Sequence, residues 1–228
     1  MKPNYEDVMI LVPVYNEAKR IAETVKDLNL IFPNIIVVND GSEDTTLEKT
    51  RNLDAKVISH PVNLGQGAAL DTGFKYFIEH TEFKYVVTFD SDGQHNKNDA
   101  FKMVDFAKSK RLEAVIGTRF ARKSSIRKIP FLKRITLRLA ILYEKIFYSI
   151  DFTDAHNGIR VLSRDLVRLH LVPIINQDMA HATEIAYKIC RSTLPYSEYP
   201  VSISYTNTKS QSPLNSINII FRNIFLKL

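Results

Sequence analysis

The sequence predicts an α/β domain with a mostly parallel sheet. Short β-branched runs alternate with helical patterns over the first 120 residues, a rhythm typical of parallel α/β sheets. Asp, Asn, Gly and Ser cluster where strands are expected to end, at 39–44 and 90–94, and ligands of open α/β sheets bind outside these carboxyl ends. The 228 residues, 45% of them hydrophobic, suffice for one domain or one domain plus an appendage.

The first nine elements follow from hydrophobic periodicity. Strands are expected where short apolar runs stand between turn signals, and helices where apolar residues return every three or four positions. In chain order they are strand 8–14, helix 18–30, strand 35–40, helix 45–53, strand 55–60, helix 67–80, strand 85–90, helix 98–109 and strand 113–118.

Beyond residue 120 the pattern changes. A basic segment broken by proline leads to a helix at 132–148 and a loop at 151–160, with mixed structure to 205. One side of the helix is apolar, through Phe131, Ile135, Leu139, Leu142 and Ile146. A neighbouring stripe is basic, through Arg134, Arg138 and Lys145. The pattern fits a helix at a membrane interface or an ordinary surface helix packed on the core.

The charge is concentrated rather than spread. Residues 122–150 hold eight Lys or Arg and one acid, Glu144, so this segment carries a charge of +7. The net charge of the chain is +6, so the rest of the chain carries −1. A nucleic-acid partner is not expected, because the domain has no general basic surface. Cys190 is the only cysteine, so no internal disulfide forms and a reducing, cytoplasmic location is favoured. No apolar stretch is long enough to span a membrane, but peripheral attachment stays open.

The C-terminal segment 211–228 is amphipathic. Its apolar residues recur at helical spacing, at Ile217, Ile220, Phe221, Ile224 and Leu228. We expect a helical appendage that packs on the body, joins a homo-oligomer or dips into a membrane surface.

The sharpest chemical signal is the run "TFDSDGQH". Here a strand delivers two carboxylates, Asp90 and Asp92, followed by Gln94. Hard oxygen ligands of this kind suit Mg²⁺ or Mn²⁺, which bind few protein carboxylates and complete their shell with substrate phosphates. A solvated acidic turn has the same short pattern.

Two further strand ends carry polar residues. Asp40 ends a strand ahead of a helix that Ser42 or Asp44 can cap, so we expect Asp40 to bind a ligand hydroxyl or ring N–H. Gly65 and Gly67 stand at the entrance of the next helix, where backbone N–H groups can approach a phosphate or a sugar.

Together these motifs resemble family 2 inverting glycosyltransferases, which have the GT-A fold. The resemblance rests on the ordered series "VPVYNE" (12–17), "VVNDGSED" (37–44), "NLGQGAALDTG" (63–73) and "DSDGQH" (90–95), continued by "GTR" (117–119), "DAHNGIR" (154–160) and "EYPVSISY" (198–205). It covers about residues 8–210 and is closest to the polyprenyl-phosphate and dolichol-phosphate sugar transferases. The departures are Gln66, in place of a basic residue, the "HNGIR" run, and the lack of a Ser near Thr136 and Leu137.

The resemblance implies a catalytic domain at 1–210. Its nucleotide-sugar part is 1–120, and its acceptor part is 121–210 with a basic helix at 131–150. The donor, a UDP- or GDP-sugar, would contact Pro13, Tyr15, Glu17, Asp40, Asn63, Gly67, Asp71, Asp90, Ser91 and Asp92. Asp90, Asp92 and Gln94 would hold the metal, Arg119 and Arg160 would face phosphate groups, and Arg134 would meet the acceptor phosphate.

The acceptor decides the chemistry. A phosphate monoester, with a second pKa of about 6, is already nucleophilic at neutral pH, whereas a sugar hydroxyl requires a general base. The base candidates are Asp92, Asp178 and Glu184. The first hypothesis is transfer of a hexose to a polyprenyl phosphate at the inner face of the membrane. The alternatives are a glycan hydroxyl acceptor in capsule or lipopolysaccharide assembly, and a nucleotide-sugar binding module without turnover.

The histidines are expected to be mostly structural. His60, His156 and His181 fit buried, hydrogen-bonded positions, and His95 directly follows the expected metal loop, as a neighbour rather than a ligand.

Overall fold

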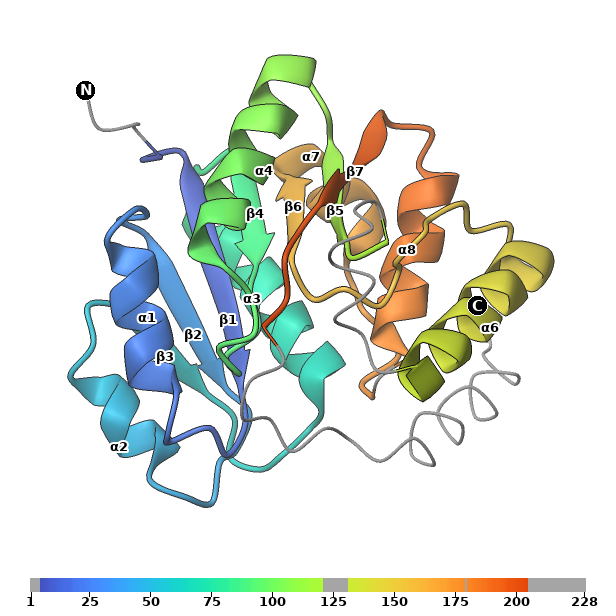
Figure 1. The fold of residues 1–228 in the computed structure, drawn as a ribbon. Helices are drawn as coiled ribbons and strands as arrows, with labels where there is room; N and C mark the ends of the chain where they lie inside the picture. The colour runs from blue at the N-terminus through green and yellow to red at the C-terminus, as the bar shows by residue number, and fades with distance from the viewer. Residues whose placement is uncertain (1–4, 121–130, 179, 205–228) are drawn as a thin grey trace.

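A computed structural model describes residues 5–120, 131–178 and 180–204. A seven-stranded sheet with the order β3-β2-β1-β4-β6-β5-β7 forms its centre, and helices cover both faces (Figure 1). The strands are β1 (Val8–Val14), β2 (Ile35–Asn39), β3 (Lys56–Ser59), β4 (Tyr85–Thr88), β5 (Ala114–Thr118), β6 (Arg160–Ser163) and β7 (Tyr196–Pro200). The expected α/β class with a mostly parallel sheet is confirmed.

The helices lie close to where periodicity placed them. They are α1 (Ile21–Asn29), α2 (Thr46–Arg51), α3 (Gln66–His80), α4 (Lys97–Lys110), α6 (Phe131–Tyr148), the short α7 (Arg164–Leu166) with a π-helical turn η1 (Val167–Leu171), and α8 (His181–Arg191). The first helix begins three residues later than expected, because the Glu17 carbonyl accepts the N–H groups of Arg20 and Ile21 in a preceding turn. Asn96 caps α4 by accepting from the Asn98 N–H.

The alternation of residues along β1 builds two hydrophobic cores. Val8, Ile10 and Val12 belong to the cluster that contains the buried faces of α1 and α4. Met9 and Leu11 point to the other face and belong to the cluster with α3, η1 and α8. Because side chains alternate in a strand, one fully buried strand serves both layers, as expected of a parallel sheet covered on both sides.

One strand interrupts the parallel arrangement of the sheet. β6 is antiparallel to both β4 and β5 and separates them. Its first residue, Arg160, pairs with Thr88 at the end of β4, so Arg160 lies in a strand and not in the expected loop 151–160. The chain reaches β6 only after α6, and alternation along the sequence does not reveal such an insertion.

The second half of the chain adds a layer beyond the sheet. α8 packs on the core, and α6 lies on the side of α8 away from the sheet (Figure 1). Among the described helices, none has both the length and the apolar character that a membrane crossing requires. The expected segment 211–228 lies outside the described residues, as do the four cations between 122 and 128.

Candidate active site

Asp90 lies just beyond the carboxyl end of β4, among groups from three other segments. Its Oδ1 accepts from Gln66 Nε2 at the start of α3 (3.2 Å), and its Oδ2 lies 3.0 Å from His95 Nε2. The loop before β6, residues 151–159, is called the acceptor loop for its expected role. A Cβ built on Gly158 would overlap the Asp90 carboxylate, so the glycine in "HNGIR" lets the acceptor loop reach Asp90. Burial alone would raise the pKa of Asp90, but His95 and then Arg160 hold that pKa below its usual value.

Asp92 follows Asp90 by two residues in the same loop. It lines a cleft of about 420 Å³ together with Arg20, Asp27, Gln94 and Lys97. Its Oδ1 accepts the backbone N–H of Gln94 (2.9 Å). Burial and then the charge of Asp90 raise the pKa of Asp92 above its usual value. The two carboxylates therefore repel one another, which is the condition that a bound cation relieves.

The oxygen set at the end of β4 fits a divalent cation of the Mg²⁺ or Mn²⁺ kind. Asp90, Asp92 and the Gln94 side-chain amide offer hard oxygen atoms next to one another in sequence, and these metals keep few protein ligands. Within the described ranges, no three His, Cys, Asp or Glu side chains are grouped to hold a metal ion. A cation here would complete its shell with other oxygens.

Two arginines near the site are buried and held by the chain. The side chain of Arg119, after β5, is bonded through Nε and Nη2 to both oxygens of Asp154, which is 1% exposed. Arg160 is 2% exposed, its Nη2 donates to the Ala155 carbonyl (3.1 Å), and burial lowers its pKa to about 10. Both supply positive charge from beneath the acceptor loop, and direct contact with a phosphate stays a prediction for each.

The histidines occupy the expected positions. His60 is hydrogen-bonded on both ring nitrogens, to Asp40 (2.7 Å) and Thr72 (2.9 Å), His181 is buried, and His156 pairs with Glu144. His95 is a neighbour of Asp90. As expected, His60, His156 and His181 are each mostly buried with a polar partner.

His181 makes stability depend on pH. Burial and the charge of Arg160 lower its pKa to about 4, whereas an unfolded His titrates near 6.5. The unfolded chain therefore binds an extra proton between these values, so this contribution is complete above about pH 6.5 and is lost as pH falls toward 4. We expect His181→Asn to reduce the stability loss between pH 7 and pH 5 by on the order of 1–2 kcal/mol, measured by urea unfolding at both pH values. His80→Asn, at a side chain 60% exposed, is the control and should leave that loss unchanged. An unaltered loss in His181→Asn contradicts the assignment.

Asp40 organises the loop after β3. Its side chain is 3% exposed and accepts from four donors: His60 Nδ1, Asn63 Nδ2, and the backbone N–H groups of Leu64 and Gly65. The expectation that Asp40 is free for a ligand overlooked this use, because its acceptor positions are filled by the loop itself. Asn63, another expected donor contact, serves the same carboxylate. Ligand contact by either residue stays a prediction.

The two glycines at the start of α3 approach the protein rather than an open site. The Gly65 N–H donates to Asp40 (2.8 Å) and the Gly67 N–H donates to the Gln177 carbonyl (2.9 Å). A Cβ on either glycine would overlap the backbone at 176–177. In this structure the two glycines allow close packing of two loops, and both N–H groups have partners within the chain. Donor contact by Gly67 stays a prediction.

The other expected donor residues lie along the same edge of the sheet. Pro13 is in β1, and Tyr15 follows it with 41% of its surface exposed. Glu17 pairs with Arg20, and Ser91 is buried. Asp71 lies on α3, where it pairs with Lys75 and accepts the Ile174 N–H (2.8 Å), so it fixes the loop before α8. The ends of β1, β2 and β4 bring the remaining residues to one side of the sheet.

The base candidates differ sharply in surroundings. Glu184 is 1% exposed, accepts from Ile175 and Asn176, and pairs with Lys188. Burial alone would raise the pKa of Glu184, but these partners lower that pKa. Glu184 is therefore a structural anchor and a poor base. Asp178 is exposed and accepts the Ala180 N–H (2.9 Å) ahead of α8. Asp92 lines the cleft described above and has a raised pKa.

Helix α6 has an inverted pattern of burial. Ile135, Leu139, Leu142 and Ile146 are 39–64% exposed, and Arg138 is exposed beside them. Among the described side chains of α6, Glu144 alone is buried. The alternative in which this apolar side packs on the core is therefore wrong for these four residues. The side chain of Arg134 lies outside the described part, so its acceptor role stays a prediction.

Several contacts between the motifs were not predicted from the sequence. Gln66 was noted only as a departure, yet it bonds Asp90, and Gly158 and Glu144 received no role. The signal for Gly158 was a glycine beside the carboxyl edge of the sheet. The signal for Glu144 was a single acid within eight cations, which is unusual on a basic helix unless the acid is buried with a partner.

Known proteins are similar to the chain along most of its length. A family model described as glycosyl transferase family 2 matches residues 9–170. The chain is 26% identical to the UDP-N-acetylglucosamine–dolichyl-phosphate N-acetylglucosaminyltransferase of Methanococcus voltae, across 97% of this chain and 96% of that protein. It is 23% identical to the undecaprenyl-phosphate mannosyltransferase of Micrococcus luteus, across 86% of this chain and 82% of that protein. A solved structure of glucosyl-3-phosphoglycerate synthase from Mycobacterium tuberculosis, in complex with Mn²⁺, UDP-glucose and phosphoglyceric acid, aligns with a TM-score of 0.65 and 14% identity. That alignment covers 95% of this chain and 76% of that one.

Proposed function

Because the chain belongs to glycosyl transferase family 2 and shares the GT-A fold, we propose that it moves a hexose from a UDP- or GDP-sugar to a polyprenyl phosphate, with Mg²⁺ or Mn²⁺, at the inner face of the membrane. The observation that carries the proposal is the meeting of Asp90 with the acceptor loop, through Gly158 and Arg160, at the carboxyl edge of the sheet. Relatives named for dolichyl and undecaprenyl phosphate support the acceptor class.

The donor would bind along the ends of β1, β2 and β4. Tyr15, which is exposed after β1, would cover the nucleotide base, with Pro13 and Glu17 as further contacts. The loop that Asp40 holds through Asn63 and Gly65 forms the wall of the nucleotide site. Ser91 and Gly67 act here as parts of the wall.

Asp90, Asp92 and Gln94 would hold the metal beside the donor diphosphate. A bound divalent ion supplies positive charge for the leaving diphosphate. Gln66 and His95 fix the Asp90 carboxylate from two sides, so its oxygen atoms are oriented before any ligand binds. Burial and the Asp90 charge raise the pKa of Asp92, so a bound cation would stabilise its carboxylate form.

The acceptor phosphate would attack the anomeric carbon from the side of the 151–160 loop. Its oxygen forms the new bond as the bond to the diphosphate breaks, and the configuration inverts. No general base is required, since a phosphate monoester is largely a dianion at neutral pH. Arg119 and Arg160 contribute positive potential from the buried side of the acceptor loop. Arg134 on α6 is the remaining candidate for direct contact with the acceptor phosphate.

The exposed side of α6 would rest on the membrane that holds the acceptor. Four large apolar side chains face outward there, with Arg138 and Lys145 exposed next to them. Apolar burial in the interface, together with attraction of roughly 1 kcal/mol per cation at an anionic surface, gives reversible attachment. The same surface would present the polyprenyl phosphate to the acceptor loop.

Replacing Arg138 and Leu142 together with Glu is expected to weaken binding to phosphatidylserine-containing vesicles at least about tenfold, since one cation and one apolar contact are lost. Vesicle sedimentation measures it. The matched control, Leu30→Glu with Arg51→Glu, alters an exposed apolar residue and an exposed cation away from α6 and should leave binding unchanged. Equal binding by both variants would rule out α6 as the membrane contact.

A donor panel tests the function itself. UDP-glucose, UDP-galactose, UDP-N-acetylglucosamine and GDP-mannose are each incubated with Mn²⁺ and a polyprenyl phosphate, and nucleotide release and organic-extractable sugar are measured. We expect one donor to yield both. Nucleotide release without lipid product would move the acceptor to a glycan hydroxyl, and donor binding without release from any donor would favour a binding module.

A further inference from the structure

The buried acid of α6 connects that helix to the acceptor loop and to α8. Glu144 has a side chain 4% exposed, and its Oε1 accepts from Thr183 Oγ1 on α8 (2.7 Å) and lies 2.9 Å from His156 Nε2. Its Oε2 is buried without a hydrogen-bond partner among the described residues. A buried carboxylate is costly unless a cation compensates it, and His156 is the one described side chain in ion-pair distance that can carry that charge.

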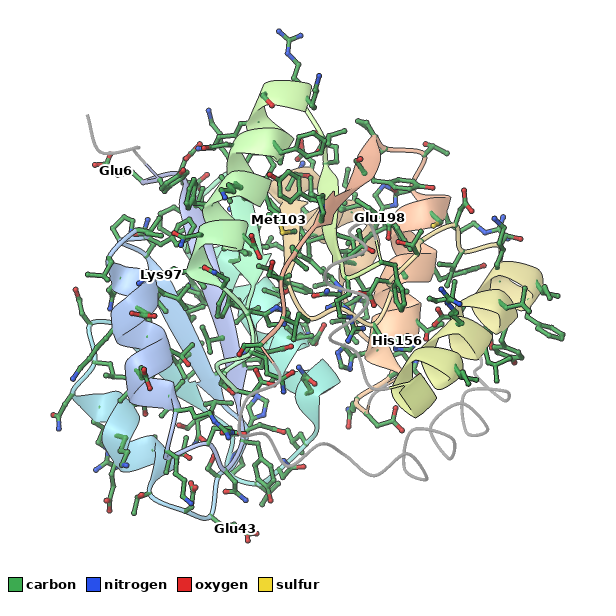
Figure 2. The ribbon with its side chains drawn as sticks, in the orientation of Figure 1. Glu6, Glu43, Lys97, Met103, His156 and Glu198 are labelled. Atoms are coloured by element: carbon green, nitrogen blue, oxygen red, sulfur yellow. The ribbon has the colours of Figure 1, made fainter. Side chains whose placement is uncertain are left out.

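His156 is held by one edge of its ring. Nε2 faces Glu144, so Nδ1 on the other edge points away from it, and the side chain keeps 17% of its surface exposed. Among the described residues, no partner is found for Nδ1. The residue lies in the acceptor loop, where Asp154 binds Arg119 and Gly158 meets Asp90. Figure 2 places it where this loop passes between α6 and α8.

We propose that His156 binds an anionic oxygen of the acceptor phosphate through the Nδ1 edge of its ring, and that Glu144 is a positioning residue that holds the ring by Nε2. The proposal rests on the proposed function and deepens it, because it names an acceptor contact outside the arginines. A ring with one edge fixed loses little freedom on binding phosphate, and hydrogen bonds to an ionised acceptor are about twice as strong as neutral ones.

His156→Gln tests the contact. A glutamine amide has one nitrogen, which Glu144 would occupy, so the second nitrogen of the His156 ring is lost. With farnesyl phosphate as the acceptor, the acceptor KM is expected to rise about tenfold, with kcat and the donor KM within about twofold. The control His80→Gln, at an exposed histidine on α3, should match the wild type. An unchanged acceptor KM in a folded His156→Gln protein overturns the proposal. A fall in kcat without a change in the acceptor KM overturns it as well.

Glu144→Gln provides an independent variant that leaves His156 in place. Its amide oxygen can still accept from Thr183, but the amide carries no charge and holds the His156 ring less firmly, so the acceptor KM should rise several-fold while kcat and the donor KM stay within about twofold. An unchanged acceptor KM in the folded Glu144→Gln protein overturns the positioning role. If the wild type fails to transfer sugar to farnesyl phosphate with any donor, the proposed function fails first. If the wild type transfers and the variants match it, only this inference fails.

Discussion

Replacing Asp92 with asparagine is expected to lower kcat/KM for sugar transfer at least about a thousandfold, because several kcal/mol of charge stabilisation at the leaving diphosphate depend on a metal ligand here. Asparagine has nearly the same shape, and its side-chain oxygen can still accept the Gln94 N–H that Asp92 accepts at 2.9 Å. The fold should therefore persist while the charge is lost. Nucleotide release in the presence of Mn²⁺ measures the effect, and circular dichroism verifies the fold.

The cleft offers a matched control for this variant. Asp27 lines the same cleft, but its side chain is 59% exposed and pairs with Lys97 at the surface. Asp27→Asn should keep transfer within about threefold of the wild type, since exposed pairs contribute little. A thousandfold loss in both variants would assign the effect to the charge of the whole cleft, and near-normal transfer by Asp92→Asn would exclude Asp92 from the metal site.

Asp154→Ala is expected to lower the free energy of unfolding by about 3–5 kcal/mol, the typical cost of leaving one member of a buried ion pair without its partner. Asp154 is 1% exposed and accepts from the backbone and side chain of Arg119 and from Asn157. Its removal takes away the carboxylate that binds the Arg119 guanidinium, which is itself largely buried. Urea unfolding at pH 7 measures the change.

Asp151→Ala is the control for Asp154→Ala, because it removes a carboxylate from the same loop at the surface. Asp151 has a side chain 73% exposed and pairs with Lys145. Its loss should alter stability by less than about 1 kcal/mol. If Asp154→Ala costs no more than this control, the Arg119 pair does not hold the acceptor loop.

The first half of the fold follows from local pattern. β1, α1, β2 and α3 have the periodicity and turn signals that mark strands and helices, and the strand ends carry the polar residues that lie at the sheet edge. β6 was not foreseen, because its place between β4 and β5 depends on a return of the chain after α6, and such a return leaves no local signal.

The roles of polar residues were harder to predict than their positions. Asp40 stands at the expected strand end, yet its oxygens are filled by the loop that follows β3, a contact that spacing does not reveal. Gly67 stands at the expected helix entrance and packs against residues 176–177 instead of an open site. A residue type at a strand end indicates that a site is near, but long-range contacts decide which groups remain available.

The inversion of α6 shows the same limit in another way. The sequence places Leu139 and Leu142 on one side and Glu144 away from them, but periodicity does not say which side faces the protein. The structure turns the apolar side outward, with Glu144 held by His156 and Thr183. The contacts of Glu144 with His156 and Thr183, both outside α6, determine which side of the helix faces the protein. Amphipathicity alone did not predict that side.

Analysis of the product tests the central claim most directly. The purified chain is incubated with the active donor, farnesyl phosphate and Mn²⁺, and the product is examined by ³¹P NMR before and after mild acid. The account predicts a phosphodiester signal that forms only with the metal present and disappears in mild acid as the sugar is released. An acid-stable sugar product, or a phosphodiester formed equally well in excess chelator, would contradict it.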